Sequence, residues 1–393
     1  MSTTTVDCAG SPRELGLAQG RALAGLVRGA HEALASLEVF RMRQPWWLPY
    51  PLFRRGAERK ARSLLEAAWR RDFPSMDQRL QGLAEGAGIR LESLYLMNSL
   101  EAFLSTLGDA VASPTGEGLP EVVPVPAACS AAAVRGAKSA SGEPMIARNF
   151  DYLPLVQPYF CVRRTRPTGG RASVDLTVAP LVGAVDGLND AGLAITYDYG
   201  YSTDRSEPSG TLSMAISEAL ERCATVEEAA RHIASRPRWG GGLLMLADAS
   251  GDIASLELSN TRSALRRPEP GEDTLVHSNK YSVEAMTEVQ VADDARFTER
   301  GPKALRGKRV HDSAEKRAAR IGELLAKAGP LTPETLGAVM ADHGPDGRPK
   351  GTSPCVHSDY WNTTACVQLF PRSRRARISF THACQPSFTD FSL

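Results

Sequence analysis

A proline-rich stretch at residues 114–126, PTGEGLPEVVPVP, divides the chain into two parts of different character. Proline fixes φ, lacks a backbone N–H and disfavours helix at the residue before it, so we expect an extended, exposed path here. Helical patterns dominate before this stretch, and strand patterns dominate after it. The sequence therefore predicts an α+β protein with an N-terminal helical segment followed by a sheet-rich part.

Four helices are predicted in the first part from apolar residues at helical spacing. They cover residues 12–35, 57–71, 75–87 and 92–104. Gly20 and Gly25 would destabilise the first helix in isolation, so we expect both to pack closely against another element. The stretch WWLPYPLF at residues 46–53 is interpreted as a packed loop between helices, with a lid or the wall of an acyl-binding cleft as the functional alternative.

A hairpin is predicted directly after the proline-rich stretch. Small and β-branched residues at 130–134 form its first strand, SASGEP at 139–144 its turn and residues 145–147 its second strand. Cys129 stands at the leading edge of this hairpin.

Further strands and helices alternate in the rest of the chain. Strands are predicted at 159–166, 173–179, 243–247, 253–258, 363–370 and 375–381, and around a tight NDAG turn within 186–197. Helices are predicted from Thr225 to residue 234 after a capping box, on the protein surface over 308–328, and over 334–342 after a proline.

Cys129 admits two interpretations. A free cysteine in a strand is most often a small buried hydrophobic residue. Alternatively, cleavage of the Ala128–Cys129 bond would make it the first residue of a new chain, and an exposed linker that ends in two alanines suits such a cut. The freed α-amine, whose ordinary pKa is about 7.7 to 8.0, could then take the thiol proton without any histidine.

Composition and charge exclude several classes of function. The chain has 46 basic and 45 acidic residues, a net charge of +1, so no field attracts nucleic acid or an anionic membrane. Its seven cysteines are odd in number and include no CxxC pair, which favours a reducing compartment over a disulfide framework or a zinc site. No secretory signal is recognised, and no stretch approaches about 18 consecutive apolar residues. We therefore expect a cytoplasmic protein without metal or cofactor.

Seven segments carry a resemblance to one family. They are RELGLAQGRALA, LAEGAGIRLESLYLMNSLEAF, the hairpin that ends in RNFD, DGLNDAGLAITYD, LLMLADASGDIASLELS, HSNKY and SPCVHSDYWNTTACVQLF. In this order and spacing they resemble the N-terminal-nucleophile (Ntn) hydrolases, and within them the acyl-CoA:6-aminopenicillanic acid acyltransferase-like family, peptidase family C45. RNFD also resembles the Arg-Asn-x-Asp motif of bile-salt hydrolases and penicillin V acylases.

The resemblance implies a fold and an activity. The fold is the four-layer αββα sandwich of Ntn hydrolases. Residues 1–128 would form the pro-segment or α subunit and residues 129–393 the β subunit, packed as one unit; an αβ heterodimer follows from self-cleavage, and higher oligomers stay open. The activity is that of an autoproteolytic zymogen, a hydrolase or acyltransferase that acts on a small-molecule amide or acyl thioester without a cofactor.

The resemblance also assigns roles to residues of this chain. Cys129 is the thiol nucleophile, Asp151 holds its free α-amine, and Arg148 lies near the thiolate and lowers its pKa. Asn279 matches the strand-end asparagine that donates its side-chain amide to the oxyanion. The structural alternatives are an Arg148–Asp151 salt bridge and a turn or cap role for Asn279.

Five further residues are expected around this group. They are Asn149, Asn189, His277, Ser278 and Tyr281. Asn149 is expected to bond nearby backbone. Asn189 is interpreted as a turn residue whose backbone amide could face the site.

Two positions depart from the family pattern. Val356 replaces the arginine of a Ser-x-Cys-Arg-His motif, which argues against a penicillin-like substrate, and Ala128 replaces the glycine common before the nucleophile. One alternative function is an uncleaved, catalytically silent binding protein. Another is a papain-type protease that pairs Cys129 with His277 or His357, although the papain-like signature around the cysteine is missing.

Overall fold

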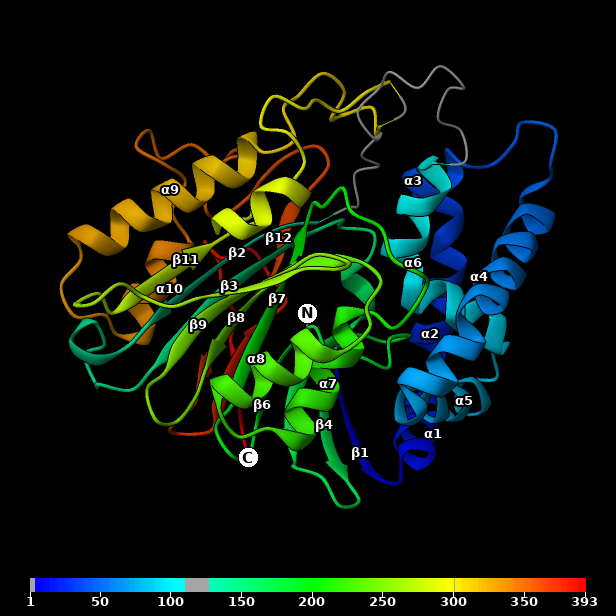
Figure 1. The fold of residues 1–393 in the computed structure, drawn as a ribbon, viewed down its shortest axis with the longest axis horizontal. Helices are drawn as coiled ribbons and strands as arrows, with labels where there is room; N and C mark the ends of the chain where they lie inside the picture. The colour runs from blue at the N-terminus through cyan, green and yellow to red at the C-terminus, as the bar shows by residue number, and fades with distance from the viewer. Residues whose placement is uncertain (1–3, 110–126, 300) are drawn as a thin grey trace.

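The computed structural model describes residues 4–109, 127–299 and 301–393, so the proline-rich stretch at 114–126 lies outside the described residues. Two β-sheets lie face to face, and helices cover their outer faces (Figure 1). Apolar side chains from both sheets, among them Ala131, Leu188 and Met245, form the core between them. The α+β fold with a four-layer αββα sandwich, predicted from the resemblance, is confirmed.

An eight-stranded sheet forms one inner layer. Its strands, in spatial order, are β1 (Thr5–Gly10), β4 (Phe160–Pro167), β5 (Ser173–Val178), β6 (Asp186–Asn189), β7 (Ala194–Gly200), β8 (Gly241–Ala247), β9 (Ile253–Leu258) and β10 (Ser263–Arg266). Neighbours are antiparallel except β1 and β4, which are parallel. The outer face of this sheet packs on α7 (Leu212–Arg222), α8 (Val226–Ser235) and the N-terminal helices. Neither β1 nor α7 was predicted.

A six-stranded antiparallel sheet forms the other inner layer. Its strands, in spatial order, are β11 (Thr274–His277), β2 (Ala127–Val134), β3 (Met145–Tyr152), β12 (Asn362–Phe370), β13 (Arg375–Ser379) and β14 (Thr389–Ser392). Its outer face is covered by α9 (Asp312–Lys327) and α10 (Pro333–Met340). The predicted hairpin is β2 and β3, and Cys129 is the third residue of β2 rather than the residue before it.

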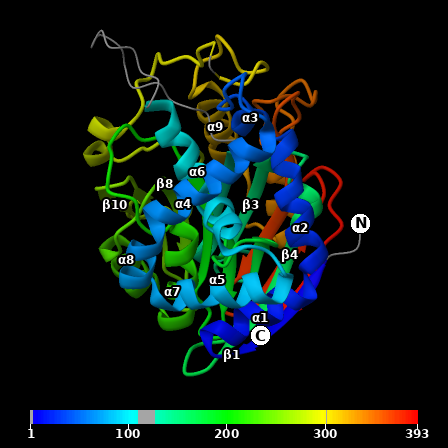
Figure 2. The ribbon, with the colours of Figure 1, turned by 90° about the vertical axis from the view of Figure 1, so that its right-hand side faces the viewer.

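The N-terminal helices lie together across one side of the sandwich (Figure 2). They are α1 (Pro12–Ala22), α2 (Ala24–Ala33), α3 (Glu38–Arg41), α4 (Tyr50–Asp72), α5 (Pro74–Ala87) and α6 (Leu91–Asp109). Short 3-10 helices are η1 (Leu34–Ser36), η2 (Gly136–Lys138), η3 (Gln157–Tyr159) and η4 (Glu284–Val289). The helix predicted over 12–35 is thus broken at Leu23.

The glycines of the first helices differ in their surroundings. A Cβ at Gly20 would lie 2.6 Å from the carbonyl oxygen of Leu83, so α1 and α5 pack backbone to backbone as predicted. Nothing lies within 4 Å of a Cβ at Gly25, so the prediction was wrong there. Trp46 and Trp47 are 95% and 66% exposed, so the aromatic stretch is not a packed loop, and α4 begins inside it at Tyr50.

The first residues of the chain join the sheet of the second part. Thr5 to Gly10 pair in parallel with Val162 to Pro167, so β1 is the edge strand next to β4. The segment before the proline-rich stretch therefore shares a sheet with the segment after it. None of the helices in the described parts of the chain is long and apolar enough to cross a membrane.

Candidate active site

Arg148 connects the two sheets beside Cys129. It lies on β3, is 1% exposed, and its Nη1 and Nε contact Asp186 Oδ2 on β6 at 2.8 Å and Asp198 Oδ1 on β7 at 3.1 Å. Its Nη2 lies 2.9 Å from the sulfur of Cys129. A guanidinium in a sandwich core needs such partners, because an unpaired buried charge is very costly. The predicted proximity of Arg148 to the sulfur is present.

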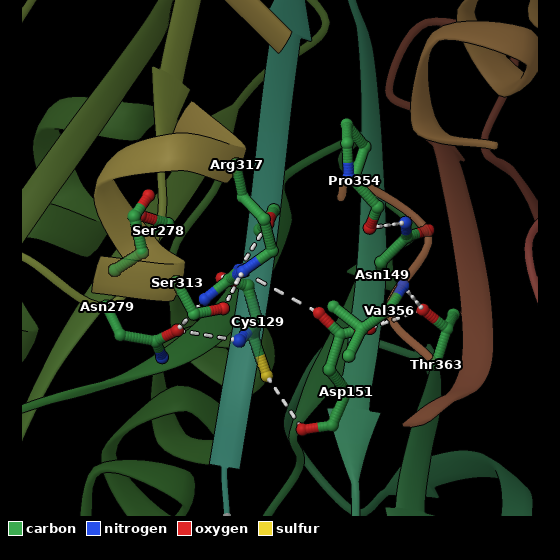
Figure 3. Close-up of polar contacts among 12 residues, drawn as sticks. Cys129, Asn149, Asp151, Ser278, Asn279, Ser313, Arg317, Pro354, Val356 and Thr363 are labelled. Carbon is green, nitrogen blue, oxygen red and sulfur yellow. Dashed lines mark hydrogen bonds and ion pairs between the residues drawn. The ribbon is translucent and has the colours of Figure 1, made fainter. Parts of the chain in front are cut away.

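Cys129 is held through its backbone as well as its sulfur. Its N–H donates to Asn279 Oδ1 at 2.8 Å, and its thiol lies 4.0 Å from the carbonyl oxygen of Asp151 (Figure 3). The side chain is 1% exposed and points between the sheets, because Cys129, Ala131 and Ala133 share one face of β2. Asn279 reaches this position because it follows β11, which pairs with β2.

Asn279 presents its oxygen, not its amide nitrogen, to Cys129. The Nδ2 atom instead donates to the carbonyl oxygen of Tyr199 on β7 at 2.8 Å. The expected oxyanion role needs an N–H directed toward the reacting carbonyl, and in the described chain that N–H bonds to Tyr199. In the described chain Asn279 Oδ1 accepts the N–H of the Ala128–Cys129 peptide bond.

Asp151 lies on the other face of β3 from Arg148. Its Oδ1 accepts a hydrogen bond from the Thr363 hydroxyl on β12 at 2.5 Å, and its Oδ2 is 3.8 Å from Arg317 (Figure 3). Neither the expected contact with the Cys129 nitrogen nor the alternative salt bridge with Arg148 is among its contacts. The pleat explains the absent salt bridge, because positions 148 and 151 are three apart along the strand and so face opposite sides of the sheet. The Cys129 N–H is bonded to Asn279 instead.

Arg317 is a further residue of the site, and it was not predicted. It lies on α9, is 1% exposed, and donates to the carbonyl oxygen of Cys129, to Ser130 Oγ and, at 2.8 Å, to Asn279 Oδ1. From the sequence alone, a surface helix is expected here. The signal was present, however, because an arginine occupies the apolar stripe formed by Ala314, Ile321 and Leu325.

The expected supporting residues divide into two groups. Asn149 Nδ2 donates to the carbonyl oxygens of Met340 and Pro354, as expected, and Ser278 Oγ donates to that of Ala314 on α9. These two residues tie the six-stranded sheet to its helices and loops. His277 lies 3.5 Å from Asp198 through Nε2 and bonds to Ser255 through Nδ1, so it supports a carboxyl that contacts Arg148.

Two other expected residues lie apart from the cysteine. The Asn189 N–H donates to Leu193, and its side chain donates to the carbonyl oxygens of Leu220 and Cys223 at the end of α7. The prediction of a tight turn at Asn189 is therefore confirmed, whereas its backbone amide does not face the site. The Tyr281 hydroxyl donates to the carbonyl oxygen of Leu258 at 2.7 Å.

The charged cluster at Cys129, formed by Arg148, Arg317, Asp151, Asp186 and Asp198, contains more carboxyls than guanidinium groups. Among the described residues, Arg148 contacts Asp186 and Asp198 directly, and Arg317 contacts Asp151. Burial raises the pKa of Asp151 and that of Asp198 to about 7 each, and the two guanidinium groups oppose this. Burial also raises the pKa of Asp186. The intact chain therefore retains a proton on this cluster near neutral pH.

The thiol of Cys129 is not activated in the intact chain. Burial raises its pKa well above the ordinary value, and the opposing effect of Arg148 is insufficient because two aspartates already neutralise that guanidinium. Burial lowers the pKa of His277 to about 3, so this histidine is neutral. His277 contacts Ser255 and Asp198, and His357 lies beside Cys355, so neither makes a papain-type pair with Cys129.

An apolar cavity of about 150 Å³ adjoins Cys129. It lies between α2 and α6 of the N-terminal segment and strands β3 and β7 of the sandwich, and its lining includes Met97, Phe150 and Trp239. Trp46, Trp47 and Tyr50 are not among the lining residues, although the sequence pointed to them for an acyl cleft. The wall thus combines residues from both sides of the Ala128–Cys129 bond.

One carboxyl interrupts the apolar wall of this cavity. Glu101 on α6 accepts hydrogen bonds from the Tyr152 and Tyr197 hydroxyls, each at 3.3 Å. Burial raises the pKa of Glu101, and the two tyrosine hydroxyls oppose this. Among the described residues, the group suited to holding a metal ion lies elsewhere and comprises His343, Cys355, His357 and Cys384.

Comparison with protein families gave one match. The family described as acyl-coenzyme A:6-aminopenicillanic acid acyl-transferase matches residues 138–340, just over half of the chain. No curated protein matched the sequence.

Several solved structures are similar to this chain. The N-acylethanolamine-hydrolyzing acid amidase ortholog of Caenorhabditis elegans is 13% identical over 62% of this chain and 93% of its own, with a TM-score of 0.42. Penicillin V acylase from Agrobacterium tumefaciens is 15% identical over 67% and 86%, with a TM-score of 0.43. A mutant of conjugated bile acid hydrolase from Clostridium perfringens is 12% identical over 67% and 97%, with a TM-score of 0.40.

Replacing Arg317 with methionine should destabilise the protein strongly. The change removes the guanidinium that contacts Asp151, the Cys129 carbonyl oxygen and Asn279 Oδ1, and it leaves the buried Asp151 carboxyl without its cationic partner, so we expect a loss of about 3–5 kcal/mol in unfolding free energy. Lys316→Met on the same helix removes an exposed pair with Asp312 and should cost less than about 1 kcal/mol. Urea unfolding measures both, and equal losses would contradict the role given to Arg317.

The raised pKa of Asp151 predicts a pH dependence of stability. Between about pH 4 and about pH 7 the folded chain keeps a proton that the unfolded chain has lost, so stability falls as pH rises through this window and levels off above it. Asp151→Asn should reduce this decline, by up to about 1 kcal/mol per pH unit, while exposed Asp294→Asn should not. Denaturant unfolding at several pH values tests this, and identical slopes for wild type and Asp151→Asn would refute it.

Proposed function

Since this chain belongs to the acyl-coenzyme A:6-aminopenicillanic acid acyl-transferase family, we propose that it is a self-processing cysteine Ntn hydrolase. It cleaves its own Ala128–Cys129 bond and then takes up the acyl group of a linear amide on the Cys129 sulfur. The observation that carries this proposal is the placement of that sulfur, which adjoins an apolar cavity and lies 2.9 Å from the Arg148 guanidinium.

Self-cleavage begins with attack of the Cys129 sulfur on the carbonyl carbon of Ala128. The C–N bond breaks, the nitrogen takes the thiol proton, and Ala128 is left as a thioester on the sulfur. Water hydrolyses this thioester, which gives a carboxylate on Ala128 and a free thiol and α-amine on Cys129. The hydrogen bond from the Cys129 N–H to Asn279 and the contact of Arg317 with the Cys129 carbonyl support this step, because they fix the residue on both sides of the sulfur.

The charge balance around Cys129 supports cleavage of the Ala128–Cys129 bond, because cleavage adds a positive charge where carboxyls are in excess. Two guanidinium groups face three carboxyls in direct contact before cleavage, and the new α-ammonium adds a third positive charge. All three carboxyls can then ionise without a net buried charge. Following the resemblance, we assign Asp151 as the carboxyl that balances the ammonium. A cation on the same residue also lowers the pKa of the thiol.

Catalysis on a substrate uses the same step as self-cleavage, which is attack of the Cys129 sulfur on an amide carbonyl. The thiol proton rests on the α-amine, so the sulfur attacks the substrate carbonyl as a thiolate, and the α-ammonium gives that proton to the leaving amine. Asn279 stabilises the oxyanion through Nδ2, which in the intact chain bonds to Tyr199, a residue of the cavity wall. Water or a second amine then attacks the thioester, so hydrolase and acyltransferase differ only in which nucleophile the site admits.

The cavity indicates the class of acyl group. Its wall is apolar apart from a small number of polar side chains such as Glu101. An apolar wall suits a hydrocarbon acyl chain on an amide or a thioester. Because α2 and α6 line it, residues 1–128 must stay bound to residues 129–393 after cleavage. The pairing of β1 with β4 supports a single packed unit of the two fragments.

An uncleaved, silent binding protein is the second candidate. One observation favours it: in the described chain the thiol is buried and its pKa is raised, and the bond to be cut lies within the regular strand β2. The two candidates differ in the mass of the mature protein.

Intact-mass spectrometry of the purified protein distinguishes the two. We expect the wild type to give the fragments Met1–Ala128 and Cys129–Leu393, because the sulfur is required for the acyl shift. Cys129→Ala should give the full-length chain, while Cys223→Ala, which removes a buried thiol at the end of α7, should be cleaved like the wild type. A full-length wild type whose Cys129 resists alkylation would support the silent binder and refute the enzyme.

A further inference from the structure

Four potential metal ligands converge beside strand β12. His343 follows α10, Cys355 and His357 lie in the loop before β12, and Cys384 follows β13. One ligand atom from each lies within 4.8 Å of all the others. The two sulfurs are 3.3 Å and 3.6 Å from His357 Nε2. No metal was predicted here, because the cysteines of the chain include no CxxC pair.

These separations suit a tetrahedral zinc ion. Bond lengths of about 2.3 Å to sulfur and about 2.0–2.1 Å to nitrogen place a sulfur and a nitrogen about 3.6 Å apart on a tetrahedron. Both measured distances from sulfur to His357 Nε2 are close to this value. Two thiolates with two imidazoles form a common structural zinc set, whereas magnesium and calcium prefer oxygen ligands.

One buried ring nitrogen of the cluster lacks a hydrogen-bond partner in the described chain. His343 Nε2 is buried and makes no hydrogen bond in the described chain, which is costly for a ring nitrogen unless a further ligand satisfies it. The His357 ring packs against the His343 ring, with centroids 5.2 Å apart, and against His382, at 4.5 Å. Cys355 is buried, and the other three ligands are partly exposed, so an ion could enter from solvent.

The cluster adjoins residues that hold the candidate active site. Pro354, next to Cys355, accepts a hydrogen bond from Asn149, and Val356 on its other side pairs with Thr363 through both backbone groups (Figure 3). Thr363 in turn donates to Asp151. An ion bound by Cys355 would therefore fix the loop that positions the Asp151 carboxyl.

We propose that His343, Cys355, His357 and Cys384 bind one structural zinc ion, which anchors the loop before β12 to the segment after β13. Binding forms two Zn–S and two Zn–N bonds, and both thiol protons leave to solvent, so no oxidant or reductant is needed. The proposal is independent of the proposed function, because zinc binding does not require Cys129 to be a nucleophile.

Metal content of the full-length chain tests the proposal. After chelation and dialysis, the wild type should bind one equivalent of zinc, and cobalt in its place should give the thiolate-to-cobalt absorption of a tetrahedral site. Cys384→Ala should weaken zinc binding at least about 100-fold, because losing a direct ligand costs more than losing a supporting group. Cys366→Ala is the matched control, since this thiol borders the cluster but donates to Thr381.

Three results would overturn the proposal. They are a wild type that binds no stoichiometric zinc, equal zinc affinity in Cys384→Ala and wild type, and a protein mass lower by two hydrogens that maps to a Cys355–Cys384 disulfide. If Cys384→Ala does not fold, the milder variant His343→Gln replaces it. The cobalt spectrum of this variant is compared with that of the wild type, and loss of the histidine ligand should shift the spectrum. An unchanged spectrum would exclude His343 as a ligand.

Discussion

The arrangement around Cys129 depends on the guanidinium of Arg148. This side chain crosses the sandwich core from β3, contacts one aspartate on each of two strands of the facing sheet, and directs its remaining nitrogen at the sulfur. A buried guanidinium with two carboxylate partners is rigid, since any displacement would leave a charge unpaired in the core. The same contacts that fix the relative position of the sheets therefore also fix the nucleophile.

The aspartates that hold Arg148 in place also prevent it from lowering the pKa of the Cys129 thiol. They neutralise its charge, so in the intact chain burial prevails and the thiol of Cys129 stays protonated. With Asp151 near Arg317, the cluster has one carboxyl in excess of its guanidinium groups, and the raised pKa of Asp151 and Asp198 expresses that excess. In our proposal, cleavage supplies the missing cation at the residue where it also activates the sulfur. The same excess of carboxyls therefore explains why the thiol is unreactive before cleavage and reactive after it.

The sequence allowed the local parts of this site to be predicted, and long-range contacts account for the rest. Cys129 and Arg148 meet because they lie on the two strands of one hairpin, which its turn residues indicate. The side chain of Asp151 could have been placed on the opposite face from the period-2 alternation of a strand. Arg317 and the four-residue cluster at Cys355 come together only through packing of distant segments, although an arginine within the apolar stripe of a helix was a readable signal. All four edge strands were missed: β10, β11 and β14 have only four residues each, whereas β1 has six residues that alternate between exposed and buried, a pattern that could have been read.

The central claim is that the α-amine of Cys129 activates its own sulfur. The most direct measurement is the rate at which iodoacetamide alkylates Cys129 in the cleaved protein as a function of pH, followed on the peptide that begins with this residue. The account predicts a midpoint below the value of about 8.5 for an ordinary thiol, because a neighbouring ammonium favours the thiolate. A midpoint at or above that value, or a cysteine that does not react, would contradict it.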